Sequence, residues 1–121
     1  MTATLTTLTI SVGIVFFIVG LLLRLIPPRK INSFYGYRTT SSMRNMDTWT
    51  TANKYSATIM IIVGLMLTII GLGTTFIPDT GATGTGVAIG LIIFSIIIMV
   101  GATEKHLKKL FDKNGNRQQE S

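Results

Sequence analysis

Three long stretches of uncharged, mostly apolar residues dominate the pattern of this chain. They run from Leu5 to Leu23, from Ala57 to Ile77 and from Gly84 to Thr103. Each is long enough to cross a bilayer as a helix, because a span needs about 20 residues at a rise of about 1.5 Å each. Lipid permits only helices or closed barrels, and these stretches lack the alternation of barrel strands. The pattern therefore predicts an all-α membrane protein with three transmembrane helices.

The same pattern predicts a single membrane domain over residues 1–121, with helices at residues 5–26, 57–77 and 84–103. A long motif-bearing loop at residues 27–54 joins the first two helices, and an amphipathic, frayed tail is expected at residues 104–121. Ser41 or Ser42 is the expected N-cap of a helix that starts at Met43 and continues into the second span.

Basic residues lie on alternate connections, which predicts the orientation in the membrane. Of the eleven Lys and Arg residues, six flank or occupy the first loop and five follow the third span, whereas residues 78–83 offer only Asp79. Because Lys and Arg next to spans are retained in the cytoplasm, we expect a multi-pass protein of the cell membrane, N-out and C-in, with the long loop cytoplasmic. The first span has no Lys or Arg before it, so we expect it to stay attached instead of being cleaved as a signal peptide.

Composition supports a bilayer environment and limits the chemistry. Only 13% of the residues are charged and 47% are hydrophobic, whereas soluble domains have about 25% charged residues. Topology and attraction to anionic membrane lipid account for the net charge of +6, so no nucleic-acid partner is expected. Cysteine is absent, His106 is the only histidine and no acidic residue lies within a span. We therefore expect no catalytic site, no metal site and no cofactor.

Glycine recurs at helical spacing in all three spans. The pairs are Gly13 with Gly20, Gly64 with Gly71, and Gly86 with Gly90. Glycine lets helices approach closely, either within one chain or between chains, although it is also frequent in membrane helices in general. Because three helices bury little surface, we also consider a homo-oligomer.

The first loop is richer in polar and aromatic side chains than a connector needs. Asn45, Trp49 and Asn53 recur at every fourth position, so on a helix they form one stripe. Arg38 and Arg44 offer planar guanidinium groups suited to carboxylate or phosphate oxygens. Two interpretations remain open. The stripe is a binding or packing site for a specific polar partner, or the aromatic and basic residues anchor the loop at the membrane surface.

This loop and the start of the second span resemble the signature of the SdpI family of bacterial membrane proteins. The matching pattern is N-x-x-x-G-Y-R-T-x-x-S-x-x-N-x-x-x-W-x-x-A-N, formed by Asn32, Gly36, Tyr37, Arg38, Thr39, Ser42, Asn45, Trp49, Ala52 and Asn53. The family's namesake is an immunity protein that protects a bacillus from its own secreted sporulation-delay toxin, and it is described as also holding an autorepressor at the membrane. The resemblance implies an immunity-like membrane protein of a Gram-positive bacterium.

Three functions are consistent with these features. The first is toxin resistance by binding or sequestration without catalysis, with helix faces at Gly64, Gly71, Gly86 and Gly90 as the contact surface and a peptide toxin or a cytoplasmic regulator as the partner. The second is that of a binder or carrier of an anionic lipid headgroup, with Arg38 and Arg44 on its phosphate. The third is a small structural subunit of a membrane complex. The expected site comprises Arg44 and the motif residues, Asn32, Gly36, Tyr37, Arg38, Thr39, Ser42, Asn45, Trp49 and Asn53.

Overall fold

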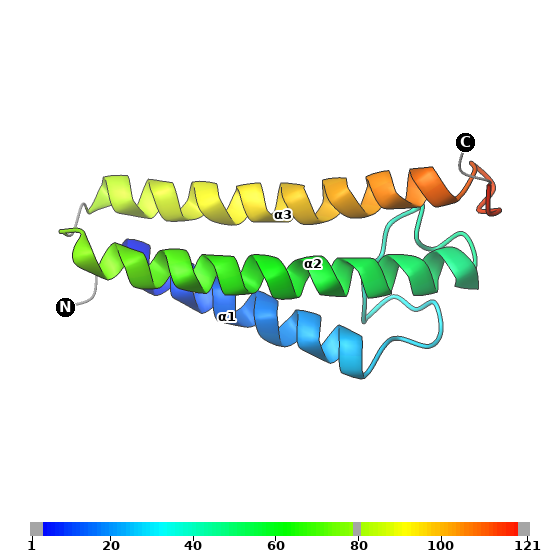
Figure 1. Ribbon diagram of the computed structural model, residues 1–121, viewed down its shortest axis with the longest axis horizontal. Helices are drawn as coiled ribbons and strands as arrows, with labels where there is room; N and C mark the ends of the chain where they lie inside the picture. Colours follow the sequence, from blue (N-terminus) through cyan, green and yellow to red (C-terminus); the bar gives the residue numbers. More distant parts are fainter. Residues whose placement is uncertain (1–3, 79–80, 119–121) are drawn as a thin grey trace.

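The computed structural model describes residues 4–78 and 81–118, which form a bundle of three long helices (Figure 1). Helix α1 spans Thr4–Leu25, α2 spans Met46–Gly73 and α3 spans Ala82–Leu110, while a short 3-10 helix, η1, follows α2 at Thr74–Phe76. All three long helices have the length and apolar composition needed to cross a membrane. The predicted all-α fold with three helices able to span a membrane is confirmed.

Helices α1 and α2 form the closest pair in the bundle, because glycine removes side chains from their contact. A Cβ atom added to Gly64 would lie 2.5 Å from the backbone nitrogen of Phe17, and one on Gly13 would lie 2.8 Å from the backbone nitrogen of Thr68. A Cβ atom on Gly20 would meet the carbonyl oxygen of Ala57 at 2.9 Å. The glycines of the first two spans therefore hold α1 on α2 within one chain.

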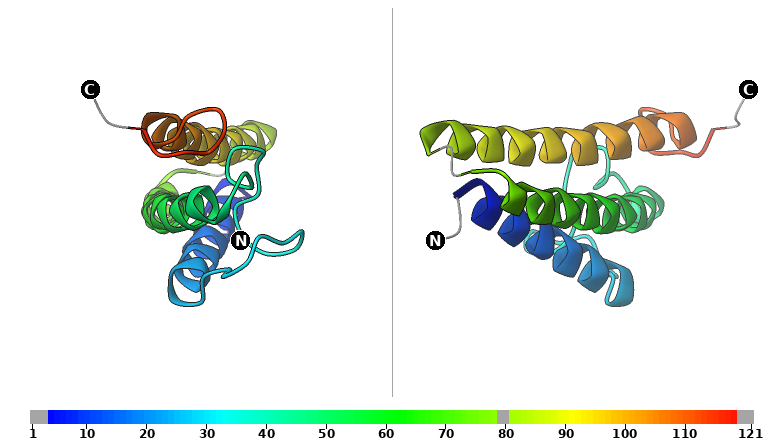
Figure 2. Two further views of the ribbon diagram at one scale, coloured as in Figure 1. Left: turned by 90° about the vertical axis from the view of Figure 1, so that its right-hand side faces the viewer. Right: turned by 60° about the vertical axis from the view of Figure 1, so that its left-hand side comes forward.

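Helix α3 packs against both α1 and α2 and is covered less than they are (Figures 1 and 2). Its buried face consists largely of small residues such as Gly84, Ala88 and Ser95. Gly86 and Gly90 face away from the bundle, since a Cβ atom on either would have no neighbour within 4 Å among the described residues. The expected contact surface for a toxin is thus wrong for Gly64 and Gly71, because α1 covers both of them.

The start of α2 differs from the prediction. One turn, closed by a 3.0 Å hydrogen bond from the Met43 nitrogen to the Thr39 carbonyl, precedes α2, but it does not join the helix. Asn45 has an extended backbone, with φ −159° and ψ 179°, and it is the N-cap of a helix that begins at Met46. The predicted N-cap at Ser41 or Ser42, and the start at Met43, are therefore wrong. Residues 46–54, the last third of the region expected as loop, form about the first two and a half turns of α2.

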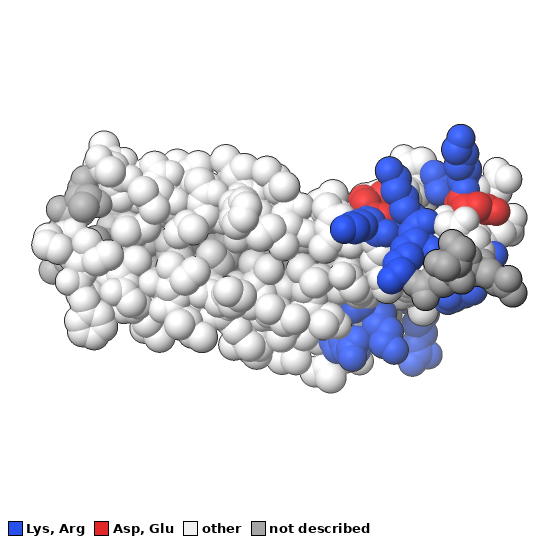
Figure 3. All heavy atoms as spheres, turned by 45° about the horizontal axis from the view of Figure 1, so that its top comes forward, with Lys and Arg blue, Asp and Glu red and all other residues white. Residues whose placement is uncertain are grey.

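The charged side chains that the structure describes gather at one end of the bundle, here called the basic end (Figure 3). The loop between α1 and α2, the first turns of α2 and the last turns of α3 meet there (Figure 1). A small core joins them, in which Tyr37 and Ala52 contact Leu107 and Phe111. This asymmetry is the one on which the N-out, C-in prediction depends, and Asp79 of the opposite connection lies outside the described residues.

Candidate functional site

The N-cap of α2 fixes the position of the whole motif. The Asn45 side-chain oxygen accepts a hydrogen bond from the Thr48 nitrogen at 2.9 Å, and the Thr48 hydroxyl accepts one from the Asn45 nitrogen at 3.1 Å. This reciprocal capping box satisfies two backbone donors that a helix start leaves without partners. It sets the register of α2, so that Trp49 and Asn53 follow on the same face, one and two turns later.

Trp49 and Asn53 face the chain's own loop. Trp49 is fully buried, and its indole nitrogen donates to the Pro28 carbonyl at 2.7 Å. The Asn53 side-chain oxygen accepts from the Tyr37 nitrogen at 2.6 Å, and its amide nitrogen donates to the Trp49 carbonyl at 2.9 Å. Because it is buried, Trp49 does not belong to an aromatic belt at the membrane surface. Pro28 and Tyr37, whose backbone groups are partners of Trp49 and Asn53, both belong to the loop that this stripe holds.

Gly36 permits the closest approach between the loop and α2. Its φ angle is +111°, in the region that side chains rarely adopt. A Cβ atom at this position would lie 2.5 Å from the Asn53 side-chain oxygen and 3.3 Å from the Trp49 ring. The backbone at Gly36 is therefore both kinked and close to α2.

Tyr37 joins the loop to α3 through an acidic residue that the sequence did not single out. Its hydroxyl donates to the Glu104 carboxylate at 2.6 Å, and the Thr39 hydroxyl donates to the same oxygen at 2.9 Å. Burial raises the pKa of the Tyr37 phenol above its ordinary value, and the hydrogen bond to Glu104 and its charge raise it further. The signal in the sequence was that Glu104 directly follows the last uncharged stretch. Its partner, however, is 67 residues away.

The remaining motif residues shape the loop itself. The Asn32 side-chain oxygen accepts from the backbone nitrogens of Phe34 and Tyr35, at 2.9 and 2.7 Å, which makes a local turn. Ser42 is fully buried, and its hydroxyl accepts from the Thr39 nitrogen at 2.8 Å and donates to the Tyr37 carbonyl at 3.2 Å. These contacts satisfy backbone groups that the irregular loop would otherwise bury without partners.

Arg38 and Arg44 each donate to a backbone carbonyl. Arg38 donates to Ser33 within the loop, and Arg44 donates to Asp112, beyond the end of α3, at 3.4 Å. The two guanidinium groups thus contact different parts of the chain, and Arg38 lines a hollow under the loop whereas Arg44 lines another beside the end of α3.

The segment after α3 folds back onto the start of α2. The Asn45 amide donates to the Gly115 carbonyl at 2.7 Å, and the Arg117 guanidinium contacts both Asp47 oxygens at 2.8 and 2.9 Å. The Gln118 nitrogen donates to the Leu110 carbonyl at 2.9 Å, which ties the turn to the end of α3. The predicted fraying is therefore wrong for residues 116–118, because backbone and charged contacts hold them. Residues 119–121 lie outside the described residues.

An apolar groove of about 440 Å³ lies beneath the loop, and we call it the loop groove. Val19 and Leu23 of α1, Met60 of α2, and Met99 and Val100 of α3 form its walls, while loop residues 34–39 form its roof. The roof contains four residues of the motif, Gly36, Tyr37, Arg38 and Thr39. The groove therefore places the motif directly against membrane-level side chains of all three helices.

Residues 4–78 and 81–118 contain no group of three or more His, Cys, Asp or Glu side chains placed to hold a metal ion. His106 stacks on Tyr55, with ring centroids 4.1 Å apart. The motif loop and the basic end thus combine hydrogen-bonding groups, apolar surface and an excess of positive charge. These are features of a binding surface.

Comparison with known proteins agrees with this arrangement. The profile of the SdpI/YfhL protein family matches residues 29–102, which include the whole motif and most of α2 and α3. The uncharacterized protein YfhL of Bacillus subtilis (strain 168) is 38% identical over 112 residues, which cover 85% of this chain and 88% of that protein. No solved structure matches the chain. By the profile match and by this relative, the chain belongs to the SdpI/YfhL family of membrane proteins.

Proposed function

We propose that this protein confers immunity by binding a membrane-active peptide toxin inside the bilayer, without catalysis. Family membership supports the general role, since the namesake of the family is an immunity protein. The observation that carries the proposal is the loop groove, which joins the family motif to apolar walls at membrane level.

The chemistry of the loop groove suits an apolar peptide segment. Its walls contain two methionines, Met60 and Met99, whose flexible thioether side chains adapt to varied partners. Arg38 on the roof lies where it can attract a carboxylate at the end of such a segment. Hydrogen bonds from Tyr37 to Asn53 and Glu104 fix the roof, so the groove exists before a peptide enters. The toxin is then held away from the lipid it would disrupt.

Survival of a toxin-sensitive Gram-positive bacterium tests the proposal. Cells that express the chain should survive a panel of membrane-active peptide toxins better than cells with an empty vector. Met99→Trp and Val100→Trp fill the loop groove and should abolish protection. Ile97→Trp is the matched control, because Ile97 is on the same helix but is 61% exposed on its outer surface, and it should protect like the original chain.

Two results would count against the proposal. Equal survival with and without the chain, at verified membrane expression and across the panel, would remove the immunity role. Protection that persists in both groove-filling variants would place the toxin elsewhere, and the loop groove would then not be its site.

A further inference from the structure

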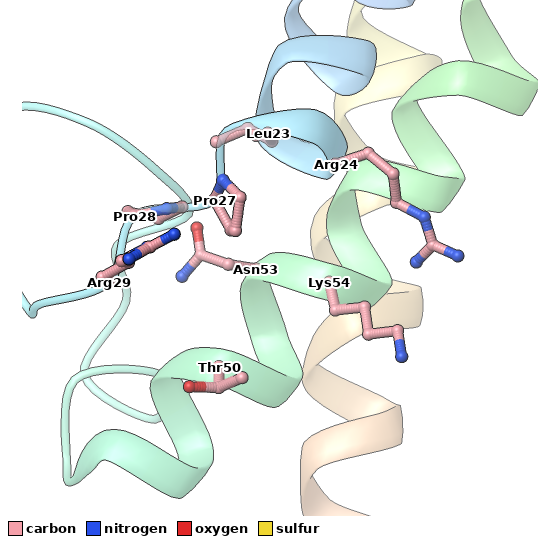
Figure 4. Close-up of a pocket in the computed structure, with 8 residues that line it drawn as sticks. All are labelled: Leu23, Arg24, Pro27, Pro28, Arg29, Thr50, Asn53 and Lys54. Atoms are coloured by element: carbon pink, nitrogen blue, oxygen red, sulfur yellow. The ribbon is translucent and has the colours of Figure 1, made fainter.

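A second hollow, which shares only Leu23 with the residues that line the loop groove, lies at the basic end (Figure 4). It measures about 350 Å³ and lies between the end of α1 and the first turns of α2. Arg24, Arg29, Lys54 and Thr50 line it together with apolar Leu23 and Pro27. In Figure 4 the charged ends of Arg24 and Lys54 extend to the same side of the helix pair, while Arg29 lies on the other side, beside Pro28.

The hollow follows from the way α1 leaves α2. Gly20 is the last glycine of α1, and it brings the two helices into contact at Ala57. Beyond that point α1 diverges from α2 (Figure 1), and Pro27 and Pro28 lead the chain out of the helix. The bond from the Trp49 indole to the Pro28 carbonyl then fixes the far wall.

The positive charges around this hollow are not compensated. The carboxylates of Asp47 and Glu104 are engaged by Arg117 and by Tyr37, respectively. That of Asp112 accepts from the backbone nitrogens of Asn114 and Asn116. Across residues 4–78 and 81–118, the side chains of Arg24, Arg29, Lys54 and Thr50 take part in no ion pair and no hydrogen bond, and of their backbone groups only the Lys54 carbonyl is engaged by a side chain, the Thr58 hydroxyl at 3.1 Å. An anionic ligand would therefore meet free donors.

The position of the hollow, next to the ends of two apolar spans, indicates which kind of anion it binds. Arg24 directly follows the uncharged stretch of α1, and Lys54 comes shortly before that of α2. Long basic side chains at such positions reach the interface, where lipid phosphates lie. We propose that the hollow binds the phosphate of an anionic lipid, with Arg24 and Lys54 on the phosphate oxygens and Arg29 and Thr50 on the outer part of the headgroup. Leu23 and Pro27 contact the part of the lipid that is nearer its acyl chains.

This site differs from the one that the sequence suggested for a lipid headgroup. Arg38 and Arg44 line other hollows. The inference is independent of the proposed immunity role, since it concerns another cavity and is tested without a toxin.

The test measures ligand-induced stabilisation of the full chain in neutral detergent. Short-chain phosphatidylglycerol, short-chain phosphatidylcholine and inorganic phosphate are titrated separately, and thermal unfolding gives an apparent Kd for each. Phosphatidylglycerol should bind, and each cation removed should weaken it about fivefold. The combined variant Arg24→Gln, Arg29→Gln, Lys54→Gln should therefore lose roughly a hundredfold in affinity. The matched control Lys105→Gln, Lys108→Gln, Lys113→Gln removes as many exposed charges from the same end and should bind within about twofold of the original chain.

The outcomes separate the sources of the anion. Equal stabilisation by inorganic phosphate would overturn the lipid assignment in favour of a free anion. Equal losses in the two charge-removal variants would mean that only general surface charge attracts the lipid. Binding of phosphatidylcholine as strong as that of phosphatidylglycerol would also overturn the proposal. Because the substituted side chains are exposed, unchanged helicity and elution volume would show that both variants fold.

Discussion

At the scale of single residues, Asn53 has the most demanding role in the motif. It is 2% exposed, and its side chain is the hydrogen-bond partner of the buried Tyr37 nitrogen. Asn53→Ala would leave that donor without a partner, so the free energy of unfolding should fall by about 1–3 kcal/mol. Denaturant unfolding in mixed micelles measures this change. Asn114→Ala, at an exposed position of the C-terminal turn, is the control and should change little. A loss of similar size in both variants would contradict the role given to Asn53.

The raised pKa of Tyr37 leads us to expect that the stability of the fold depends on pH in the alkaline range. Its pKa is raised in the folded chain by burial and by Glu104, so the folded chain keeps the phenol proton at a pH where the unfolded chain loses it. The stabilisation is complete below the ordinary pKa of about 10 and falls as the pH rises above it, by up to about 1.4 kcal/mol per pH unit.

The comparison of the original chain with Tyr37→Phe isolates this effect. At neutral pH the variant should be less stable by about 1–2 kcal/mol, because it loses a hydrogen bond to a charged, partly exposed acceptor. The difference between the two proteins should shrink as unfolding is measured at increasing pH above about 10. A difference that stays constant would show that Tyr37 does not titrate in this way.

Sequence periodicity predicted which residues of the motif share a face, but it did not predict what they contact. The i, i+4, i+8 spacing placed Asn45, Trp49 and Asn53 together, and the structure keeps them on one side of α2. Their partners at Pro28, Tyr37 and Gly115 come from an irregular loop and from the other end of the chain. Such contacts depend on backbone geometry that local patterns do not encode, and for this reason the link from Tyr37 to Glu104 was missed.

At the scale of the helices, some glycines lie at close helix contacts and others lie on open surface. A Cβ atom on Gly64 would meet backbone atoms of α1 that cannot move aside easily, whereas Gly90 has open space around it. Gly64→Ala should therefore reduce stability by about 1–3 kcal/mol through overpacking. Gly90→Ala should be neutral or slightly stabilising, because alanine favours the helix. Resistance to unfolding by sodium dodecyl sulfate in mixed micelles measures both changes, and equal effects would contradict the observed pairing of α1 with α2.

The sequence also predicted the three long apolar helices better than it predicted where they end. Long uncharged stretches indicate segments that lie in lipid. Because backbone N–H and C=O groups have no water to bond there, each of the three spans has to form a helix. Helix ends depend on single capping groups instead. Ser42 was a good N-cap candidate by residue type, but its hydroxyl bonds within the loop, and Asn45 caps α2 because its extended backbone brings its side chain to Thr48.

At the scale of the whole molecule, the distribution of charge predicts the orientation in the membrane. The loop between α1 and α2 and the end of α3 carry basic residues at the same end of the bundle (Figure 3), so a single orientation satisfies both connections. In the opposite orientation, many Lys and Arg residues would have to cross the bilayer, including those that line the proposed lipid site. The N-out, C-in prediction and that site therefore support each other, because anionic lipid and the positive-inside rule favour the same leaflet.

Cysteine labelling in intact cells tests this orientation directly. The chain has no cysteine of its own, so single substitutions give an unambiguous signal. Ser33 and Thr83 are both exposed, at opposite ends of the bundle. Thr83→Cys should react with a membrane-impermeant maleimide in whole cells, while Ser33→Cys should react only after the cells are opened. Reaction of both residues in opened cells is the control for accessibility. The reverse pattern would place the loop outside, where the motif could meet a secreted toxin directly, and the basic end would then face the outer leaflet.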